Sequence, residues 1–196
     1  MLKTFFLQNR SYRRFIEDVD IPISDLKDMI EFVRLSPATA NLQPLRYIIS
    51  NDPETNEKIF PALNWAGYLR DWDGPVIGER PSAYIIIVSE NLNPSMCDHG
   101  IALLAILLAA TEKRYGGCAI ASIKRDILRK NLQIDEKYEI PLVIALGKPA
   151  EEITIENIKS GEDVKYWRDA NNKHHVPKII VDELIIETHQ KKQKAD

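Results

Sequence analysis

The sequence has little cysteine and no excess of positive charge. Its two cysteines, Cys97 and Cys118, form no CxxC pair and no metal-ligand spacing with the four histidines, so no metal site is predicted. Because a secreted chain would more often carry a disulfide framework, a reducing, cytoplasmic setting is expected. The formal net charge of −3 gives no support for nucleic-acid binding or for attraction to an anionic membrane surface.

A long apolar run is also missing. The longest one, Ile101–Ala110, is far shorter than the roughly 20 residues that a bilayer span needs, so no membrane span is predicted. The first residues, MLKTFFLQNRSYRRF, are apolar before they are basic, which is the reverse of a signal peptide. The sequence has no internal repeat and no low-complexity linker, so a single domain covering residues 1–196 is predicted.

What is present is a mixture of helical and strand patterns. Helices are predicted over Ser24–Ser36, Asp52–Leu63, His99–Tyr115 and Ile123–Asn131, and strands over Arg46–Ser50, Ala83–Ser89 and Leu142–Gly147. The helix from His99 is apolar nearly all round before Glu112, which predicts a central core helix. Because these patterns mix without regular βαβ alternation, an α+β fold with one sheet flanked by helices is favoured over a doubly wound sheet.

The ends of these elements carry local signals. Ser24 and Asp98 are predicted to cap the helices that follow them. The pair Gly116-Gly117 is predicted to stop the core helix in the left-handed conformation. The polar segment Glu151–Val176 is expected to be irregular.

Four short segments could carry chemistry, and the first is Arg10–Arg14. Its three arginines, with Ser11 between them, can make several charge-assisted hydrogen bonds to one phosphate. The alternative is a solvated basic face. Because the sequence contains neither GxGxxG nor GxxxxGK[ST], a ligand phosphate would have to be held by side chains such as these.

The second segment, Ser36–Pro44, joins a predicted helix to a predicted strand. It offers a hydroxyl and two carboxamides between two prolines that stiffen the backbone. Amides that both donate and accept hydrogen bonds suit the edge of a heterocycle such as a flavin pyrimidine. The alternative is an ordinary polar connector.

The third and fourth segments lie later in the chain. Gly116–Ser122 has small residues that permit close approach by a flat ligand, and the alternative is a helix stop followed by tight packing. Within it, Cys118 is interpreted as a buried structural thiol, because no partnered histidine is evident in the local sequence. Lys173–Lys178 is interpreted as a basic patch near a phosphate rather than a metal site, and the alternative is a solvated loop.

Taken in order, these segments resemble the nitroreductase-like family of FMN-dependent oxidoreductases. The family patterns R-S-x-R, P-S-x-x-N-x-Q-P, G-x-C-x-[IL]-[GA] and ALG-x-P match Arg10–Arg13, Pro37–Pro44, Gly116–Ala121 and Ala145–Pro149. The resemblance spans roughly residues 8–180. It implies an α+β, nitroreductase-like fold with a central, mostly antiparallel mixed sheet flanked by helices and with a long buried core helix.

The resemblance also implies roles for the matching residues. Arg10, Ser11 and Arg13 would hold the FMN phosphate and the ribityl or pyrimidine groups. The backbone amides near Ala121 and Ser122 would lie by the flavin N5. These two residues depart from the family pattern, which has a glycine-containing pair there.

Other residues would complete the flavin site. Four of them would approach the flavin from the partner subunit: Ala38, Thr39, Asn41 and Gln43. Ala38 replaces the usual serine, so one hydroxyl contact is lost. Lys173 and His175 stand where the family usually places basic phosphate contacts. His175 replaces an arginine, so a fixed charge becomes a pH-dependent one.

The aromatic loop that contains Trp65, Tyr68 and Trp72 is not a general feature of the family. We interpret these three residues as the substrate pocket or its lid. The alternative is a satellite hydrophobic cluster.

In the cycle that the resemblance implies, NADH or NADPH donates hydride to flavin N5 and leaves. A nitroaromatic, quinone or similar small oxidised substrate then takes its place. No protein nucleophile or acid–base pair is required, so no catalytic side chain is predicted. The alternatives are a flavin reductive dehalogenase or enoyl reductase, a non-catalytic flavin-binding or storage module, and a basic-patch interaction protein without a cofactor.

A homodimer with FMN at the subunit interface follows from the resemblance, since each flavin would be lined by both chains. The apolar stretch Ile179–Ile186, expected to be a final helix or strand, could wrap a partner or pack on its own core.

Overall fold

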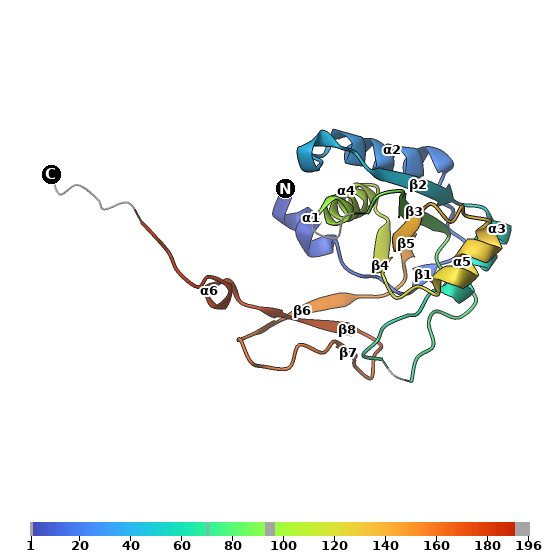
Figure 1. Cartoon of the computed structure of the whole chain (residues 1–196). Coiled ribbons are helices and arrows are strands. Elements are labelled where there is room, and N and C mark those ends of the chain that lie inside the picture. Colours follow the sequence, from blue (N-terminus) through green and yellow to red (C-terminus); the bar gives the residue numbers. More distant parts are fainter. Residues whose placement is uncertain (1, 70, 93–96, 191–196) are drawn as a thin grey trace. The chain divides into compact units, whose positions relative to one another are not determined.

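The structure is a computed structural model, and it describes residues 2–69, 71–92 and 97–190. The chain divides into two compact units, one up to Glu151 and one from Glu152 onward. The first unit contains a five-stranded sheet with helices, and the second contains a three-stranded sheet (Figure 1). The expectation of a single domain concerns how these units associate, and it stays a prediction.

The sheet of the first unit is antiparallel in each of its strand pairings. Its strands are β1 (Phe15–Ile16), β2 (Leu45–Ser50), β3 (Ala83–Ser89), β4 (Gly116–Ile120) and β5 (Glu139–Pro149). The order is β1-β5-β3-β2, and β4 pairs with β5 on the edge that β1 extends. Every residue of β3 is buried, as its β-branched run predicts.

Helices cover both faces of this sheet (Figure 1). They are α1 (Leu2–Gln8), α2 (Ile23–Leu35), α3 (Pro53–Ile59), α4 (Asp98–Glu112) and α5 (Arg125–Leu132), with short 3₁₀ turns at Thr39–Asn41 and Phe60–Ala62. Residues of α2 and α4 form one hydrophobic cluster with Ile85, and residues of α3 and α5 form another with Ile86. Since neighbouring residues of a strand point to opposite faces, the two helix pairs cover opposite faces.

The predicted caps at the starts of α2 and α4 are wrong. The residue before α2 is Pro22, which offers no side-chain cap, and Ser24 lies inside the helix. Asp98 is the first residue of α4 rather than the residue before it, and its carboxylate accepts hydrogen bonds from Thr39 instead. In both cases each helix begins earlier than the side-chain pattern indicates.

The predicted glycine stop after the core helix is also wrong. The left-handed residue after α4 is Arg114, with φ of 63°, and Gly116 and Gly117 begin β4. A Cβ at Gly117 would lie 2.6 Å from the Leu107 side chain and 3.0 Å from the Ala145 carbonyl oxygen. Glycine is therefore required because helix, strand and β5 pack closely at this point.

The second unit is more regular than its sequence indicates. Strand β6 (Ile153–Ile158) pairs in parallel with β8 (His174–Ile179), and β7 (Trp167–Arg168) pairs with β8 in the antiparallel sense. The expectation that Glu151–Val176 is irregular is therefore wrong. Beyond β8 the described chain forms only a short helix, α6 (Val181–Leu184).

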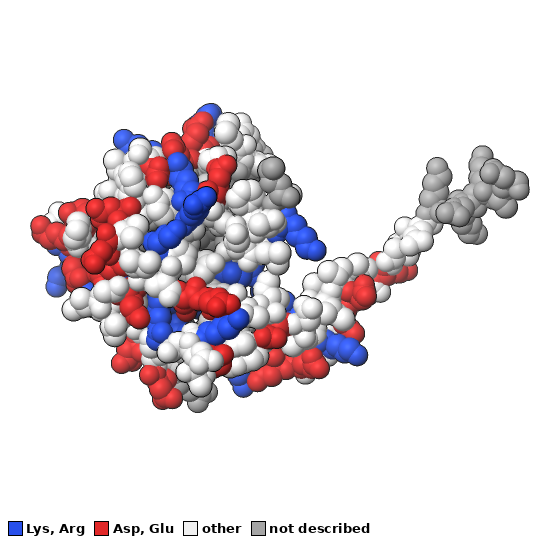
Figure 2. Space-filling view, turned by 180° about the vertical axis from the view of Figure 1, so that it is seen from behind, with Lys and Arg blue, Asp and Glu red and all other residues white. Residues whose placement is uncertain are grey.

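The surface of the chain carries both signs of charge. On the face in view in Figure 2, lysine and arginine side chains lie among aspartate and glutamate side chains. Among the described residues, no helix combines the length and the apolar character that crossing a membrane requires.

Replacing Gly117 with alanine tests the close packing at the start of β4. We expect Gly117→Ala to lower the free energy of unfolding by about 1–3 kcal/mol, the usual effect of overpacking a core. The matched control is Gly100→Ala in the first turn of α4, where an added Cβ meets nothing within 4 Å. This control should be neutral or stabilising by up to about 1 kcal/mol. Denaturant unfolding of both variants would contradict the account if it ranked them in the opposite order.

Candidate functional site

The arginine segment lies alongside β4. Ser11 forms a parallel bridge with Gly117, and the backbone N–H of Tyr12 donates to the Gly117 carbonyl at 3.0 Å. At the other end of the segment, the N–H of Ala150 donates to the Arg14 carbonyl, also at 3.0 Å. Backbone pairing therefore brings together three of the four segments that carry the family resemblance.

Glu151 stabilises the arginine segment in this position, and the sequence did not indicate this residue. Its carboxylate accepts hydrogen bonds from the backbone N–H groups of Arg13 and Arg14. The residue follows shortly after β5, and only the pairing of β1 with β5 places it beside the arginines. No local signal in the sequence indicates this contact.

Arg10 is a partly buried cation without a counterion among the described residues. Its guanidinium donates to the Phe6 carbonyl at 2.6 Å, and its buried Nε has no hydrogen-bond partner in the part of the chain that the structure describes. Burial lowers the pKa of Arg10, although an arginine stays protonated at neutral pH. A buried charge is costly unless an opposite charge compensates it, so this position suits a bound anion.

The end of β4 presents the second part of the candidate site. Ala121 and Ser122 are exposed there, as close approach by a ligand requires. Asn64, which sequence reasoning missed, donates from Nδ2 to the Ser122 hydroxyl at 3.0 Å and from its backbone N–H to the Ser122 carbonyl at 3.0 Å. This polar side chain therefore stands beside the residues predicted to lie near flavin N5.

The glycines of the same segment pack tightly, as the second half of the alternative states, although they do not stop the helix. Gly116 and Gly117 are buried, and a Cβ added at either would meet neighbouring atoms of the chain, those of Tyr12 and Pro149 at Gly116 and those of Leu107, Leu146 and Ala145 at Gly117. Cys118 is also buried, and burial raises the pKa of its thiol to about 11. The interpretation of Cys118 as a structural thiol agrees with this burial.

The three aromatic residues of the loop differ in their surroundings. Trp65 is only 9% exposed and its ring lies 5.8 Å from that of Phe60. Trp72 packs against the same core, with the Arg14 guanidinium 5.9 Å from its ring. This packing agrees with the hydrophobic-cluster alternative for Trp65, which is buried, while Trp72 is only partly buried. Tyr68 is 52% exposed, and the substrate role of the three residues stays a prediction.

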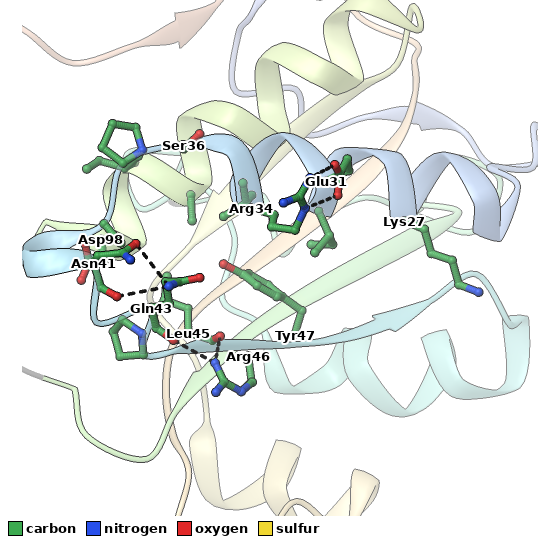
Figure 3. A pocket seen from close by; sticks show the side chains of 17 residues that line it. Lys27, Glu31, Arg34, Ser36, Asn41, Gln43, Leu45, Arg46, Tyr47 and Asp98 are labelled. Atoms are coloured by element: carbon green, nitrogen blue, oxygen red, sulfur yellow. Dashed lines mark hydrogen bonds and ion pairs between the residues drawn. The ribbon is translucent and has the colours of Figure 1, made fainter.

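The loop between α2 and β2 borders a cavity of about 330 Å³, which Figure 3 shows from close by. Asn41 and Gln43 point toward one another, and Gln43 Nε2 donates to the Asn41 carbonyl at 3.1 Å and to its Oδ1 at 3.2 Å. Tyr47 extends from β2 into the same cavity, and burial raises its pKa to about 12, so its phenol is protonated at neutral pH.

The carboxamides of this loop retain a complementary pair of groups. With Gln43 Nε2 already donating, Asn41 Nδ2 remains as a donor and Gln43 Oε1 remains as an acceptor. Both side chains are exposed. A neighbouring donor and acceptor match a ring edge that alternates carbonyl and N–H groups, as the flavin pyrimidine does.

The arginine segment and the amide loop lie at opposite corners of the sheet. Gly117, beside Ser11, is level with Ala83 of β3 through β5, whereas the Pro44 carbonyl accepts a hydrogen bond from Ser89 at the other end of β3. Six residues along β3 correspond to about 20 Å, and β4 and β2 are three strand spacings apart, about 14 Å. The arginine segment and the amide loop of one chain are therefore far apart.

Lys173 and His175 lie in the second unit, where carboxylates hold both. Lys173 Nζ is 2.6 Å from Glu152 Oε1. The Nδ1 of His175 is 2.6 Å from Glu156 Oε1, and its Nε2 is 3.4 Å from Asp169 Oδ2. The hydrogen bond to Glu156 raises the pKa of His175, despite an opposing effect of burial. The predicted phosphate contacts of these two residues stay predictions.

This environment makes the second unit sensitive to pH. Because the folded-state pKa of His175 is raised, its stabilising effect is fully present below its unfolded pKa of about 6.5 and is lost as pH rises through the folded value. We expect the melting temperature of the wild type to exceed that of His175→Gln most at pH 6 and least at pH 9. His189→Gln, at an exposed histidine beside Glu187, is the matched control. An equal difference at every pH would contradict the assignment.

No family model matches the chain, but individual proteins are similar to most of it. A Bacillus subtilis strain 168 protein named as an NAD(P)H nitroreductase, MhqN, is 21% identical over 184 residues, covering 72% of this chain and 85% of the relative. A Thermus thermophilus protein named NADH dehydrogenase is 25% identical over 198 residues, covering 85% of this chain and 95% of the relative.

Solved structures show the same fold at low sequence identity. A nitroreductase family protein from Clostridium novyi NT has a TM-score of 0.63 and 19% identity, covering 76% of this chain and 85% of its own. An FMN-dependent nitroreductase from Clostridium difficile R20291 has a TM-score of 0.57 and 20% identity, with 76% and 87% covered. A gut-bacterial enone reductase, CLA-ER, has a TM-score of 0.62 and 21% identity, with 77% and 90% covered. The chain therefore has the α+β nitroreductase fold, and the resemblance to the nitroreductase-like family that its sequence motifs indicate is confirmed.

Proposed function

We propose that this protein binds FMN and is an NAD(P)H-dependent oxidoreductase that reduces small oxidised acceptors such as quinones or nitroaromatics. The names of the relatives support a nicotinamide reductant, and the FMN-dependent nitroreductase of Clostridium difficile supports the flavin. The observation that carries the proposal is the guanidinium of Arg10 beside β4, uncompensated among the described residues, because it suits a phosphate in a chain without a phosphate-binding glycine loop.

The residues present fit FMN at both of its ends. Arg10, Ser11 and Arg13 would hold the phosphate and the ribityl chain. The exposed Ala121 and Ser122 leave room for the ring system at the other end of β4, about 17 Å further along the strand. The proposed phosphate site is thus separate from the proposed ring site, as an extended mononucleotide requires.

When bound, FMN supplies hydride transfer between a nicotinamide and a second substrate. The chain's own residues bind and orient. Asn64 holds the Ser122 hydroxyl and fixes the end of β4 at the proposed ring site. Tyr68, exposed in the aromatic loop, is the proposed substrate contact. We assign no side chain to proton transfer.

We further propose that the protein acts as a homodimer that shares each flavin between two chains. The proposed ring site at Ala121 and Ser122 lies at the end of β4, whereas the Asn41–Gln43 amides lie before β2, three strand spacings or about 14 Å across the sheet. One chain therefore does not place its own amides against the ring that its own β4 would hold. A second copy related by a two-fold axis could place its amide loop beside the first copy's β4.

Exposed apolar side chains offer an interface for this second copy. Helix α4 is apolar nearly all round, and one of its apolar side chains, Leu104, is 44% exposed. Near it, α1, α2 and α4 border an apolar groove of about 340 Å³, whose lining includes Leu2, Phe5 and Phe32. Contact between exposed apolar surface of this kind and water is unfavourable, and such patches often mark an interface that a partner covers.

The C-terminal segment of the second unit also exposes apolar side chains. Its exposed large apolar side chains are Val181, Leu184, Ile185 and Ile186. Such a segment gains little from solvent exposure and much from burial against another surface. Its proposed role is to wrap the partner chain.

The substrate class has one specific rival. The similarity to CLA-ER favours enone reduction as a second candidate, because that protein is described as an enone reductase. Steady-state assays with NADH or NADPH against quinones, nitroaromatics and enones distinguish the two. A protein that holds FMN but oxidises neither nicotinamide is a flavin-binding or storage module. The expectation of a reducing, cytoplasmic setting stays a prediction.

The phosphate assignment predicts the effect of removing the two arginines. The double variant Arg10→Ala, Arg13→Ala should bind FMN roughly 100-fold or more weakly, because each charge-assisted hydrogen bond contributes about 1.5–3 kcal/mol. Fluorescence titration of the apoprotein with FMN measures this. The control is Lys58→Ala, Lys137→Ala, which removes the same charge from two exposed ion pairs.

Two outcomes would end this proposal. A colourless wild-type protein that takes up no added FMN would exclude a flavin enzyme. An unchanged affinity in the double arginine variant would show that the phosphate lies elsewhere.

The shared flavin predicts that assembly and cofactor binding are lost together. We expect Leu104→Glu, which places a charge on the exposed face of α4, to give a monomer by light scattering and to weaken FMN binding at least tenfold. Ile77→Glu is the matched control, since Ile77 is 81% exposed and lies on a turn outside α4. A monomeric Leu104→Glu variant that binds FMN as tightly as the wild type would contradict the shared site.

A further inference from the structure

The amide loop before β2 has an unusual backbone. Ala40, Asn41 and Gln43 have φ of 48°, 54° and 48°. This left-handed region is unfavourable for residues with a Cβ, least so for asparagine, and three such residues within four positions are rare. Backbone of this kind persists only where the surroundings hold it in place, and it is found most often at binding sites.

Asp98 anchors the start of the loop. Its side chain is buried, with only 6% of the residue exposed, and its Oδ1 accepts from the Thr39 backbone N–H at 2.8 Å and from the Thr39 hydroxyl at 3.1 Å. Thr39 immediately precedes the first left-handed residue, Ala40. Because Asp98 is the first residue of α4, the core helix fixes its position and the helix dipole favours its charge.

The far end of the loop is held from β2 and β3. Arg46 donates from Nη1 to the carbonyls of Gln43 at 2.9 Å and Leu45 at 2.8 Å. The Ser89 hydroxyl donates to the Pro44 carbonyl at 3.2 Å. The left-handed residues, with the amides that face the proposed flavin, therefore lie between two anchored ends. Of these anchors, Asp98 is the one that combines a charge with burial.

The buried carboxylate of Asp98 is not fully satisfied by the described chain. Its second oxygen, Oδ2, is buried and has no hydrogen-bond partner among the described residues. A buried carboxylate whose second oxygen accepts no hydrogen bond destabilises the folded state, because its charge is removed from water without full compensation. A neutral side chain in its place would avoid this desolvation of the charge. A role in holding the loop explains why a charge occupies this position.

We propose that Asp98 is a positioning residue that holds the left-handed turn of residues 40–43 and thereby the amides that contact the flavin. This inference rests on the proposed function, since the flavin is part of it. Asp98 itself touches the loop and not the cofactor. Its removal should therefore release the loop locally and weaken FMN binding without removing any proposed flavin contact.

Two variants at this position separate the acceptor from the charge. Asp98→Asn keeps an oxygen that can accept from Thr39, and Asp98→Ala removes it. We expect the dissociation constant for FMN to rise in the order wild type, Asp98→Asn, Asp98→Ala, with about a tenfold rise for alanine. In the apoprotein, amide hydrogen exchange in residues 39–43 should accelerate in the same order, while exchange in β3 and β5 stays at the wild-type rate.

Two control variants exclude simpler explanations. Asp126→Ala removes another carboxylate from the first turn of a helix, α5, and tests the helix dipole alone. Asp25→Ala breaks the contacts with Lys113 and Tyr115 and destabilises the same unit away from the loop. Both controls should keep the wild-type affinity for FMN. If Asp98→Ala does not fold, Asp98→Asn carries the affinity test. Thr39→Val, which removes the hydroxyl donor to Asp98, is then read only by the exchange rate of residues 39–43 in the apoprotein, because Thr39 is itself a predicted flavin residue.

The outcomes distinguish the inference from the proposed function. An FMN affinity of Asp98→Ala equal to that of the wild type, or an unchanged exchange rate in residues 39–43, overturns the role of Asp98. A wild type that takes up no FMN overturns the proposed function, and the exchange measurement on the apoprotein then still decides whether Asp98 holds the loop. Equal losses of FMN affinity in Asp98→Ala and Asp25→Ala reduce Asp98 to a general stabilising residue and also overturn the inference.

Discussion

The pairing of β5 with β3 on one edge and with β4 on the other determines where every candidate flavin contact of the first unit lies. This register places Gly117 level with Ala83, and the arginine segment follows because Ser11 pairs with Gly117. The same register puts the amide loop at the diagonally opposite corner, where Ser89 holds Pro44. A one-residue slip would turn the buried side chains of these strands to the opposite face, so the pairing is strongly specified.

This arrangement relates the fold to the proposed assembly. Each chain offers a cationic segment at one edge of its sheet and a pair of carboxamides at the other. A flavin that used both would join two chains, and the apolar face of α4 around Leu104 would be covered in the process. Cofactor binding and dimerisation would then stabilise one another, since each favours the same folded arrangement.

The sequence predicts most of the first unit because its signals there are local. The β-branched run Ala83–Ser89 and the apolar helix before Glu112 each specify their own structure, and both are confirmed. The parallel pairing of β6 with β8 was missed because it joins segments about 20 residues apart whose side chains are mostly polar or half-exposed. The glycine pair at 116–117 was misread because its function depends on packing against α4 and β5 rather than on backbone conformation.

The residues of the candidate site also differ in whether their signals in the sequence are local. Residues in short motifs, such as Arg10 and Asn41, could be named from the sequence. The roles of other residues depend on partners that are distant in the sequence, and the sequence does not indicate these roles. Examples are Asn64 beside Ser122 and Glu151 beside the arginines. Asp98 was noticed as a helix cap, but its contact with Thr39 joins positions 59 residues apart, and only the folded chain shows it.

The most direct test of the shared flavin site is complementation between two defective chains. One chain carries Arg10→Ala with Arg13→Ala, the other carries Asn41→Ala with Gln43→Ala, and neither homodimer should retain FMN. Random mixing makes half of the dimers mixed, each with one intact site, so about one quarter of the wild-type FMN content should return. If mass spectrometry shows mixed dimers and the FMN content stays at the level of the parent variants, the two halves of the site do not come from different chains.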